Sequence, residues 1–184
     1  MVNARRQPDP HPRLDPILGR GRFNVLITED DRPRGEEYWV RQFPRLLEPQ
    51  GVSAYIARSG EEAINLAEHH EFHAAIIDLG TPKAPIDPSP LPGAGRGAMW
   101  LLELFRRLPQ RPPTVVVTSR RYPERDLDRF LREALRLGAF SVIHQPIDLE
   151  RMLAVFRTLL DRQYRGHGPP RNHPRPRTSP TDDS

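Results

Sequence analysis

The chain has 184 residues, a formal net charge of +4 at pH 7 and no cysteine. The lack of cysteine excludes disulfide bridges and thiolate chemistry, and no apolar run approaches the roughly 18–20 residues that cross a bilayer. Arginine supplies nearly all of the positive charge and alternates with acids, as at 124–126, which favours a solvated helix face over a specific nucleic-acid site. The N-terminus has no apolar signal-peptide core, so we expect a cytoplasmic protein that binds no membrane and no specific nucleic acid.

The two ends of the chain differ in composition from its middle. Residues 1–22 and 165–184 are polar and rich in proline and arginine, and neither segment has a hydrophobic period. Such segments cannot bury enough apolar surface to fold, so we predict a disordered N-terminal extension and a disordered tail. One folded domain is expected at 23–164. The tail is too short for a helix-turn-helix unit, so we expect any output to pass through protein contacts.

Strand-like and helix-like segments alternate through this domain. The predicted strands are short apolar runs rich in β-branched residues, at 23–28, 52–57, 74–79, 114–119 and 139–144. Each is followed by an amphipathic segment with helical spacing, at 34–47, 60–70, 98–108, 126–137 and 148–164. Five strand–helix repeats predict an α/β fold with parallel strands, right-handed crossovers and helices on both faces of one sheet.

Several residues mark the ends of these helices. Ser59, with Glu62 three residues later, forms a capping-box pattern before the second helix. Gly138 is a natural left-handed residue after the fourth helix, and Asp148 is an N-cap for the last. Pro44 lies inside the first predicted helix, so we expect a kink or an irregular last turn there.

Asp78 is the residue around which the predicted sheet edge is organised. It stands at the end of the buried run that begins at Ala74, and Gly80 and Pro82 follow closely. In open α/β folds this carboxyl edge is where ligands bind, and an ionised carboxylate there is costly unless a charged group answers it. The other polar residues expected at this edge are Glu29, Asp30, Thr118 and Gln145.

These residues suit a magnesium site. Carboxylates brought together repel one another, and a hard divalent cation relieves that repulsion. Mg²⁺ prefers oxygen ligands, keeps several waters and needs only one or two protein carboxylates. Asp30, Asp78 and the backbone carbonyl of Gly80 can supply such ligands, with Thr118 as a neutral donor opposite. A carboxylate in such a site can act as a nucleophile on phosphorus.

Each of these residues also has a simpler interpretation. Asp78 can be merely an exposed turn acid, and Thr118 an ordinary strand-end threonine. The acids at 29–31 can be a helix-start cluster that the helix dipole favours. For His144 we expect a packed or edge position and no catalytic role. The arrival of the acids at one edge favours the site over these interpretations.

The chain from about residue 23 to 162 resembles the receiver domain of two-component response regulators. The segments that carry the resemblance are 25–31, 59–63, 76–79 with Pro82, 115–118, 138–139, 145–146 and 148–150. The resemblance implies a flavodoxin-like, doubly wound, five-stranded parallel sheet. It also implies a signalling module and not an enzyme, which receives phosphate from a histidine kinase or phosphotransfer protein and acts on a downstream protein.

The same resemblance implies roles for individual residues. Asp78 would be the phosphoacceptor that becomes an aspartyl phosphate. Mg²⁺ would be held by Asp78 and Asp30 directly, by Glu29 through water, and by the carbonyl of Gly80. Thr118 would hydrogen-bond the phosphoryl group and act as the switch.

The sequence departs from the family pattern in ways that concern this site. Gln145 stands where the family has a lysine, and one charge at about 4 Å is worth about 4 kcal/mol at an effective dielectric of 20. The only lysine is Lys83, which lies in a loop and is a candidate substitute. The proline- and glycine-rich loop at 82–97 is about a dozen residues longer than usual, and 119–128 is also lengthened. Val142 stands where the family has an aromatic residue on the fifth strand.

These departures keep two other functions open. The first is a pseudo-receiver, an interaction module that works without phosphorylation, which Gln145 and the long loop favour. The second is a phosphatase or phosphotransferase of the dehalogenase type. Such enzymes need a second acid two residues after the nucleophile, and Gly80 occupies that position. We therefore expect a stand-alone, atypical receiver.

Overall fold

The computed structural model describes residues 23–29, 38–84, 96–118, 124–144 and 146–164. The predictions made for the two ends of the chain and for most of the 82–97 loop lie outside these residues. Asp30 and Gln145 also lie outside them. In the part of the chain that is described, no helix is long and apolar enough to cross a membrane.

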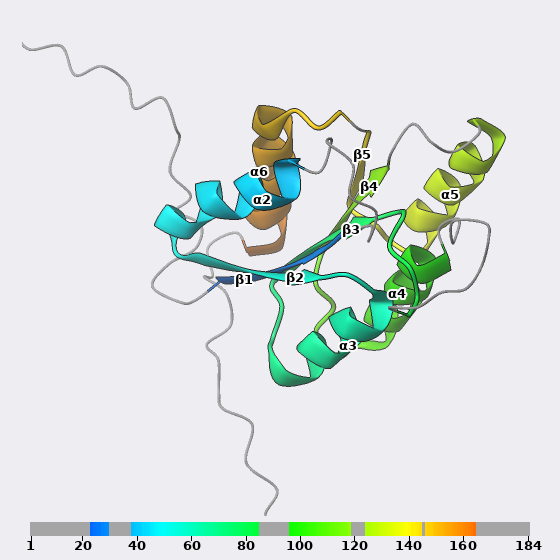
Figure 1. The fold of residues 1–184 in the computed structure, drawn as a ribbon, viewed down its shortest axis with the longest axis horizontal. Helices are drawn as coiled ribbons and strands as arrows, with labels where there is room; N and C mark the ends of the chain where they lie inside the picture. Colours follow the sequence, from blue (N-terminus) through cyan, green and yellow to red (C-terminus); the bar gives the residue numbers. More distant parts are fainter. Residues whose placement is uncertain (1–22, 30–37, 85–95, 119–123, 145, 165–184) are drawn as a thin grey trace, which may run out of the picture.

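The centre of the molecule is one parallel sheet. Its strands among the described residues are β1 (Phe23–Thr28), β2 (Val52–Ala57), β3 (Ala74–Asp78), β4 (Thr114–Thr118) and β5 (Ser141–His144). They lie in the order β2-β1-β3-β4-β5, and every neighbouring pair is parallel (Figure 1). This is the flavodoxin-like strand order, so the predicted fold class is confirmed.

Helices cover both faces of this sheet. They are α2 (Tyr38–Leu47), α3 (Gly60–His69), α4 (Arg96–Arg107), α5 (Glu124–Arg136) and α6 (Leu149–Tyr164), with a 3-10 turn, η1 (Glu48–Gln50), after α2. Helices α2 and α6 lie on one face, whereas α3, α4 and α5 lie on the other (Figure 1). The three-layer arrangement follows from parallel strands, because each crossover must return over one face of the sheet.

Each face of the sheet has its own hydrophobic core. Successive strand residues point to opposite faces. In β1, therefore, Val25 and Ile27 pack with α2 and α6, whereas Leu26 packs with α3 and α4. In β3, Ile76 and Ile77 divide in the same way. These strands are apolar at both kinds of position because neither face of the sheet meets water.

The residues predicted to mark helix ends do so in the structure, with small shifts in the helix bounds. The hydroxyl of Ser59 accepts the N–H of Glu62 at 3.1 Å, as in the predicted capping box. The Glu62 carboxylate accepts the N–H of Arg58, the residue before the N-cap, at 2.7 Å in place of the N–H of Ser59 itself. Gly138 has a left-handed φ of 86° after α5. Helix α2 continues through Pro44 and then passes into the 3-10 turn, the irregular end that we expected.

Candidate functional site

Strand register brings the predicted residues to one edge of the sheet. Ile27 pairs with Ile76, so the same register carried two residues further places Glu29 level with Asp78. Asp78 in turn pairs with Val117 of β4, the neighbour of Thr118. The carboxyl ends of β1, β3 and β4 therefore meet, as the order of repeats predicted.

A closed ring of hydrogen bonds holds the backbone of Asp78. Its N–H donates to the hydroxyl of Thr28 at 3.0 Å, and the hydroxyl of Thr81 donates to its carbonyl at 2.7 Å. The two threonine hydroxyls are 2.6 Å apart, and Thr28 must be the donor because Thr81 has already used its proton. All three residues are buried. The ring ties the end of β1 to the turn after β3.

The Asp78 side chain is held in one orientation by the same turn. Its Oδ1 accepts the backbone N–H of Gly80 at 2.7 Å, and the side chain is only 7% exposed. Asp78 is therefore a partly shielded carboxylate in a fixed position, and the interpretation of it as an exposed turn acid is wrong.

The loop that follows Asp78 is anchored to two helices. The N–H groups of Gly60 and Glu61, at the start of α3, donate to the carbonyls of Pro82 and Lys83 at 2.8 and 2.9 Å. At the start of α4, a Cβ atom on Gly97 would collide with the carbonyls of Thr81 and Pro82. Only glycine permits this close approach. The segment beside Asp78 is therefore attached to the starts of α3 and α4 up to Lys83.

Two charged side chains predicted near this edge, those of Glu29 and Lys83, each contact another side chain of the protein. The Glu29 carboxylate lies 3.3 Å from Nε of Arg58, whose side chain is 70% exposed, so the pair is worth little to stability. The Nζ atom of Lys83 lies 5.1 Å from the centroid of the Trp100 ring in a cation–π contact. Lys83 therefore contacts α4 in this structure.

The hydroxyl of Thr118 has a partner that the sequence did not suggest. Thr118 is fully buried, and its Oγ1 lies 2.9 Å from Nδ1 of His144, its register partner at the end of β5. We predicted a packed or edge position for His144, and this residue is exposed on the edge strand β5. The signal available in the sequence was that both residues end adjacent strands.

The predicted metal ligands are only partly within the described residues. No cluster of three or more histidine or acidic side chains suited to a metal occurs among those residues, and Asp30 is not one of them. Of the predicted acidic ligands, Glu29 and Asp78 are described: Glu29 directly follows β1, Asp78 ends the neighbouring β3, and both offer hard oxygen donors. Oxygen donors in this number suit Mg²⁺, which completes its shell with water and phosphate oxygens.

Comparison with known proteins identifies the fold. No protein-family model matches the sequence, and no curated protein does. Solved structures do match: a CheY-like response regulator receiver domain from Methanospirillum hungatei JF-1 is 23% identical, with a TM-score of 0.57 over 77% of this chain and 95% of that one. A CheY-like receiver domain from Methylobacillus flagellatus is 24% identical, with a TM-score of 0.53 over 74% and 98%.

A third match points the same way. A two-component response regulator from Clostridium difficile is 19% identical, with a TM-score of 0.57 over 77% of this chain and 98% of that one. Many further neighbours are receiver domains as well. The chain therefore has the fold of response regulator receiver domains. At these identities the likeness establishes the fold, and the activity must be argued from the site.

Proposed function

From the receiver fold of this chain we propose a phosphoacceptor function: Asp78 takes up a phosphoryl group from a histidine kinase or phosphotransfer protein. The observation that carries the proposal is the Asp78 carboxylate, which is ionisable, nearly buried and held by Gly80 at the sheet edge. The fold uses this edge for ligands. The protein would act as a signalling module through protein contacts and not as an enzyme.

The proposed step exchanges one bond to phosphorus for another. A carboxylate oxygen of Asp78 bonds to phosphorus while the bond from phosphorus to the donor's histidine nitrogen breaks, and the histidine leaves with that electron pair. The fixed turn at 78–81 contributes positioning, because the attacking group does not have to be ordered during the reaction. Thr118 would then donate its hydroxyl proton to a phosphoryl oxygen.

Mg²⁺ is the cofactor that these residues suit. Asp30 and Asp78 would bind it directly, Glu29 through water, and Gly80 through its carbonyl. Bound there, the ion would neutralise the charge of the acids and of the phosphoryl oxygens. With Gln145 in place of lysine, Thr118 becomes a main neutral donor for the phosphoryl group, so the response is expected to be weaker than with a lysine.

Beryllium trifluoride, a phosphoryl mimic that aspartates bind when Mg²⁺ is present, tests the proposal. Backbone NMR signals of Asp78, Gly80 and Thr118 should shift in the wild type and stay in place in an Asp78→Asn variant. An Asp128→Asn variant, altered on an exposed face of α5, is the matched control and should respond like the wild type.

The alternative is a pseudo-receiver that binds its partner without phosphorylation. The partners already found for Glu29 and Thr118 within the protein favour it, because both groups would have to change partners during phosphorylation. A wild type that gives no shift with the mimic at any Mg²⁺ concentration would reject phosphoacceptance at Asp78 and favour this alternative.

A further inference from the structure

The contact between Thr118 and His144 joins two residues that end adjacent strands. Thr118 Oγ1 lies 2.9 Å from Nδ1 of His144, and the two residues are register partners. Register partners in a parallel pair point to the same face of the sheet. The threonine is fully buried, whereas the histidine is exposed on the edge strand β5. A buried hydroxyl is therefore held by a side chain that reaches it from the surface.

Proton counting assigns the direction of this hydrogen bond. A threonine hydroxyl has one proton to donate, and a neutral imidazole has one nitrogen with a proton and one with a lone pair. Among the described residues, His144 is the only hydrogen-bond partner of the Thr118 hydroxyl. A buried O–H without an acceptor is costly. This cost favours the arrangement in which the hydroxyl donates to Nδ1 and the imidazole has its own proton on Nε2.

We propose that His144 is a positioning residue of the phosphoacceptor site, which competes with the phosphoryl group for the single proton of the Thr118 hydroxyl. This inference rests on the proposed function of Asp78. In the unphosphorylated protein the proton is donated to His144. To hydrogen-bond a phosphoryl oxygen, the hydroxyl must release the imidazole and turn. His144 thereby stabilises the unphosphorylated form.

The substitution at position 145 gives this competition more weight. A lysine there would bind the phosphoryl group whatever the hydroxyl did, whereas glutamine offers only a neutral N–H. Thr118 is then one of few donors left, so a residue that holds its proton controls a larger part of the binding free energy. Val142, on the same strand, has neither a ring nor a hydroxyl that could respond to the Thr118 hydroxyl in place of His144.

The first experiment reads the resting hydrogen bond and needs no phosphoryl group. Long-range proton–nitrogen NMR spectra of the histidine rings should show His144 in the Nε2–H tautomer, with a hydrogen-bonded lone pair at Nδ1. A Thr118→Val variant, which keeps the shape and removes the hydroxyl, should change the Nδ1 signal. A protonated Nδ1 in the resting wild type would overturn the assigned direction and the competition with it.

The second experiment measures the competition itself. A His144→Ala variant should bind beryllium trifluoride with Mg²⁺ about threefold to tenfold more tightly than the wild type, the range expected for one hydrogen bond that no longer has to break. A His144→Asn variant should restore wild-type affinity, because the asparagine oxygen can accept at the position of Nδ1. A merely structural role of the imidazole would not give this rescue.

A double-mutant cycle tests whether the effect of His144 on affinity depends on the Thr118 hydroxyl. Without the Thr118 hydroxyl there is nothing to compete for, so His144→Ala should have no effect on affinity in a Thr118→Val background. An equal effect in both backgrounds, or weaker binding in His144→Ala, would overturn the proposal. Circular dichroism melts confirm that each variant is folded, and a Thr118→Ser variant keeps the hydroxyl as a second reference.

The two proposals fail in different ways. If no variant binds the mimic while the imidazole signature is as described, the phosphoacceptor function is wrong and the competition falls with it. If the wild type binds the mimic at Asp78 and the cycle is additive, only the role of His144 is wrong.

Discussion

The polar residues at the two ends of the sheet differ in what surrounds them. At the amino end, Asn24 and His73 exchange hydrogen bonds between β1 and the start of β3. The N–H of Asn24 donates to Nδ1 of His73 at 3.0 Å, and the N–H of His73 donates to the carbonyl of Asn24 at 2.9 Å. The Asn24 side chain also donates to the carbonyl of Glu71. Apart from the His73 imidazole and the Asn24 amide, every group in these hydrogen bonds belongs to the backbone.

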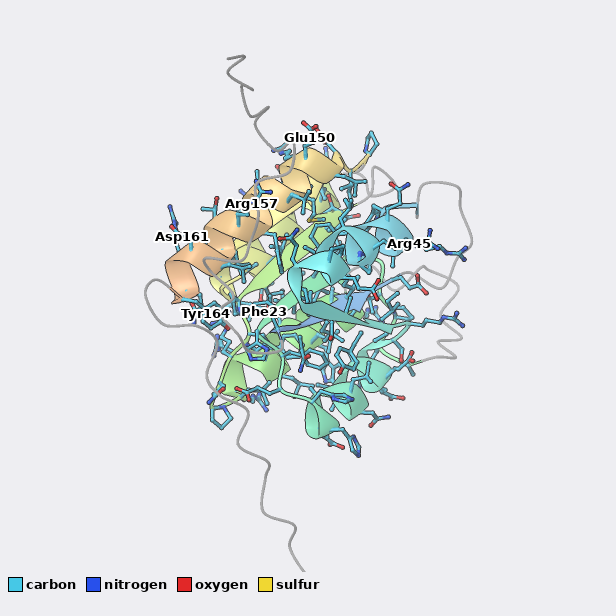
Figure 2. The ribbon with its side chains drawn as sticks, turned by 90° about the vertical axis from the view of Figure 1, so that its left-hand side faces the viewer. Phe23, Arg45, Glu150, Arg157, Asp161 and Tyr164 are labelled. Atoms are coloured by element: carbon cyan, nitrogen blue, oxygen red, sulfur yellow. The ribbon has the colours of Figure 1, made fainter. Side chains whose placement is uncertain are left out.

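Aromatic rings close this amino end against water. The Phe23 ring packs against the rings of His73, Phe156 and Tyr164, with centroid separations of 4.9, 6.3 and 5.7 Å. Figure 2 shows Tyr164, at the end of α6, beside Phe23. The hydroxyl of Tyr164 donates to the carbonyl of His73 at 2.8 Å. Helix α6 is thereby fastened to the sheet at its last residue.

Burial also sets the charge of the amino end. It lowers the pKa of His73 against the opposing effect of the nearby Glu71 carboxylate, so His73 is neutral and its Nδ1 can accept. Burial raises the pKa of Tyr164 to about 12, so its hydroxyl keeps the proton that it donates. The side chains of His73 and Tyr164 are therefore both uncharged at neutral pH.

The carboxyl end contrasts in what its polar side chains contact. Glu29 contacts an exposed arginine, and Thr118 contacts an exposed histidine. The comparison shows polar side chains enclosed by aromatic rings at the amino end, and polar side chains whose partners are exposed at the carboxyl end.

The largest expected effect comes from the amino end. A Phe23→Ala variant should lower the free energy of unfolding by about 3–5 kcal/mol, because it leaves a cavity among the surrounding rings. Urea unfolding followed by circular dichroism measures this. Leu135→Ala, at a side chain that is 54% exposed, is the control and should change stability by less than about 0.5 kcal/mol. A small effect at Phe23 would mean that its rings do not secure this end.

The second prediction concerns the hydrogen-bonded ring at the carboxyl end. A Thr28→Val variant leaves the buried N–H of Asp78 without its acceptor, so stability should fall by about 1–3 kcal/mol. The same variant should weaken the response to beryllium trifluoride, which Phe23→Ala should not do in its folded fraction. Thr28→Ser keeps the hydroxyl and should retain most of both properties. Equal behaviour of the two variants would rule out a role for the ring.

The third prediction concerns the hydrogen bond by which Tyr164 attaches the end of α6 to the sheet. A Tyr164→Phe variant loses the hydrogen bond to the His73 carbonyl and should be less stable by about 0.5–1.5 kcal/mol. It should also remove one phenol that ionises only near pH 12 from the ultraviolet titration of the folded protein. Tyr55→Phe is the control, since the hydroxyl of Tyr55 has no hydrogen bond among the described residues, and it should leave that late step in place.

The smallest expected effect is a dependence of stability on pH. His73 has a lowered pKa in the folded state, so the unfolded chain takes up the proton first as the pH falls below the ordinary value of 6.5. The stabilisation from neutral His73 is present above that value and is lost as the pH falls toward the folded-state pKa.

Unfolding titrations between neutral and mildly acid pH check this dependence. The wild type should lose stability over this range more steeply than a His73→Gln variant. His69→Gln, altered at an exposed histidine on α3, should keep the wild-type slope. An unchanged slope in His73→Gln would show that another group is responsible.

The sequence by itself determined the order of strands and helices along the chain and which of their faces are apolar. Alternating and helical patterns are local, because each residue's face is set by the geometry of its own element. The runs around Val25 and Ile76 are apolar on both faces, and this alone requires covering helices. The same local logic located Asp78 and Glu29 at the carboxyl edge, because a parallel sheet leaves no other place for residues that follow its strands.

Only the tertiary structure decided which side chains touch at that edge. The ring of Thr28, Thr81 and Asp78 joins residues about 50 positions apart, and the hydrogen bond from Thr118 to His144 depends on the register between β4 and β5. Register and helix packing are set by the fit of whole elements, and no short pattern in the chain encodes them. For that reason the residue that holds the Thr118 hydroxyl became visible only once the strands were placed side by side.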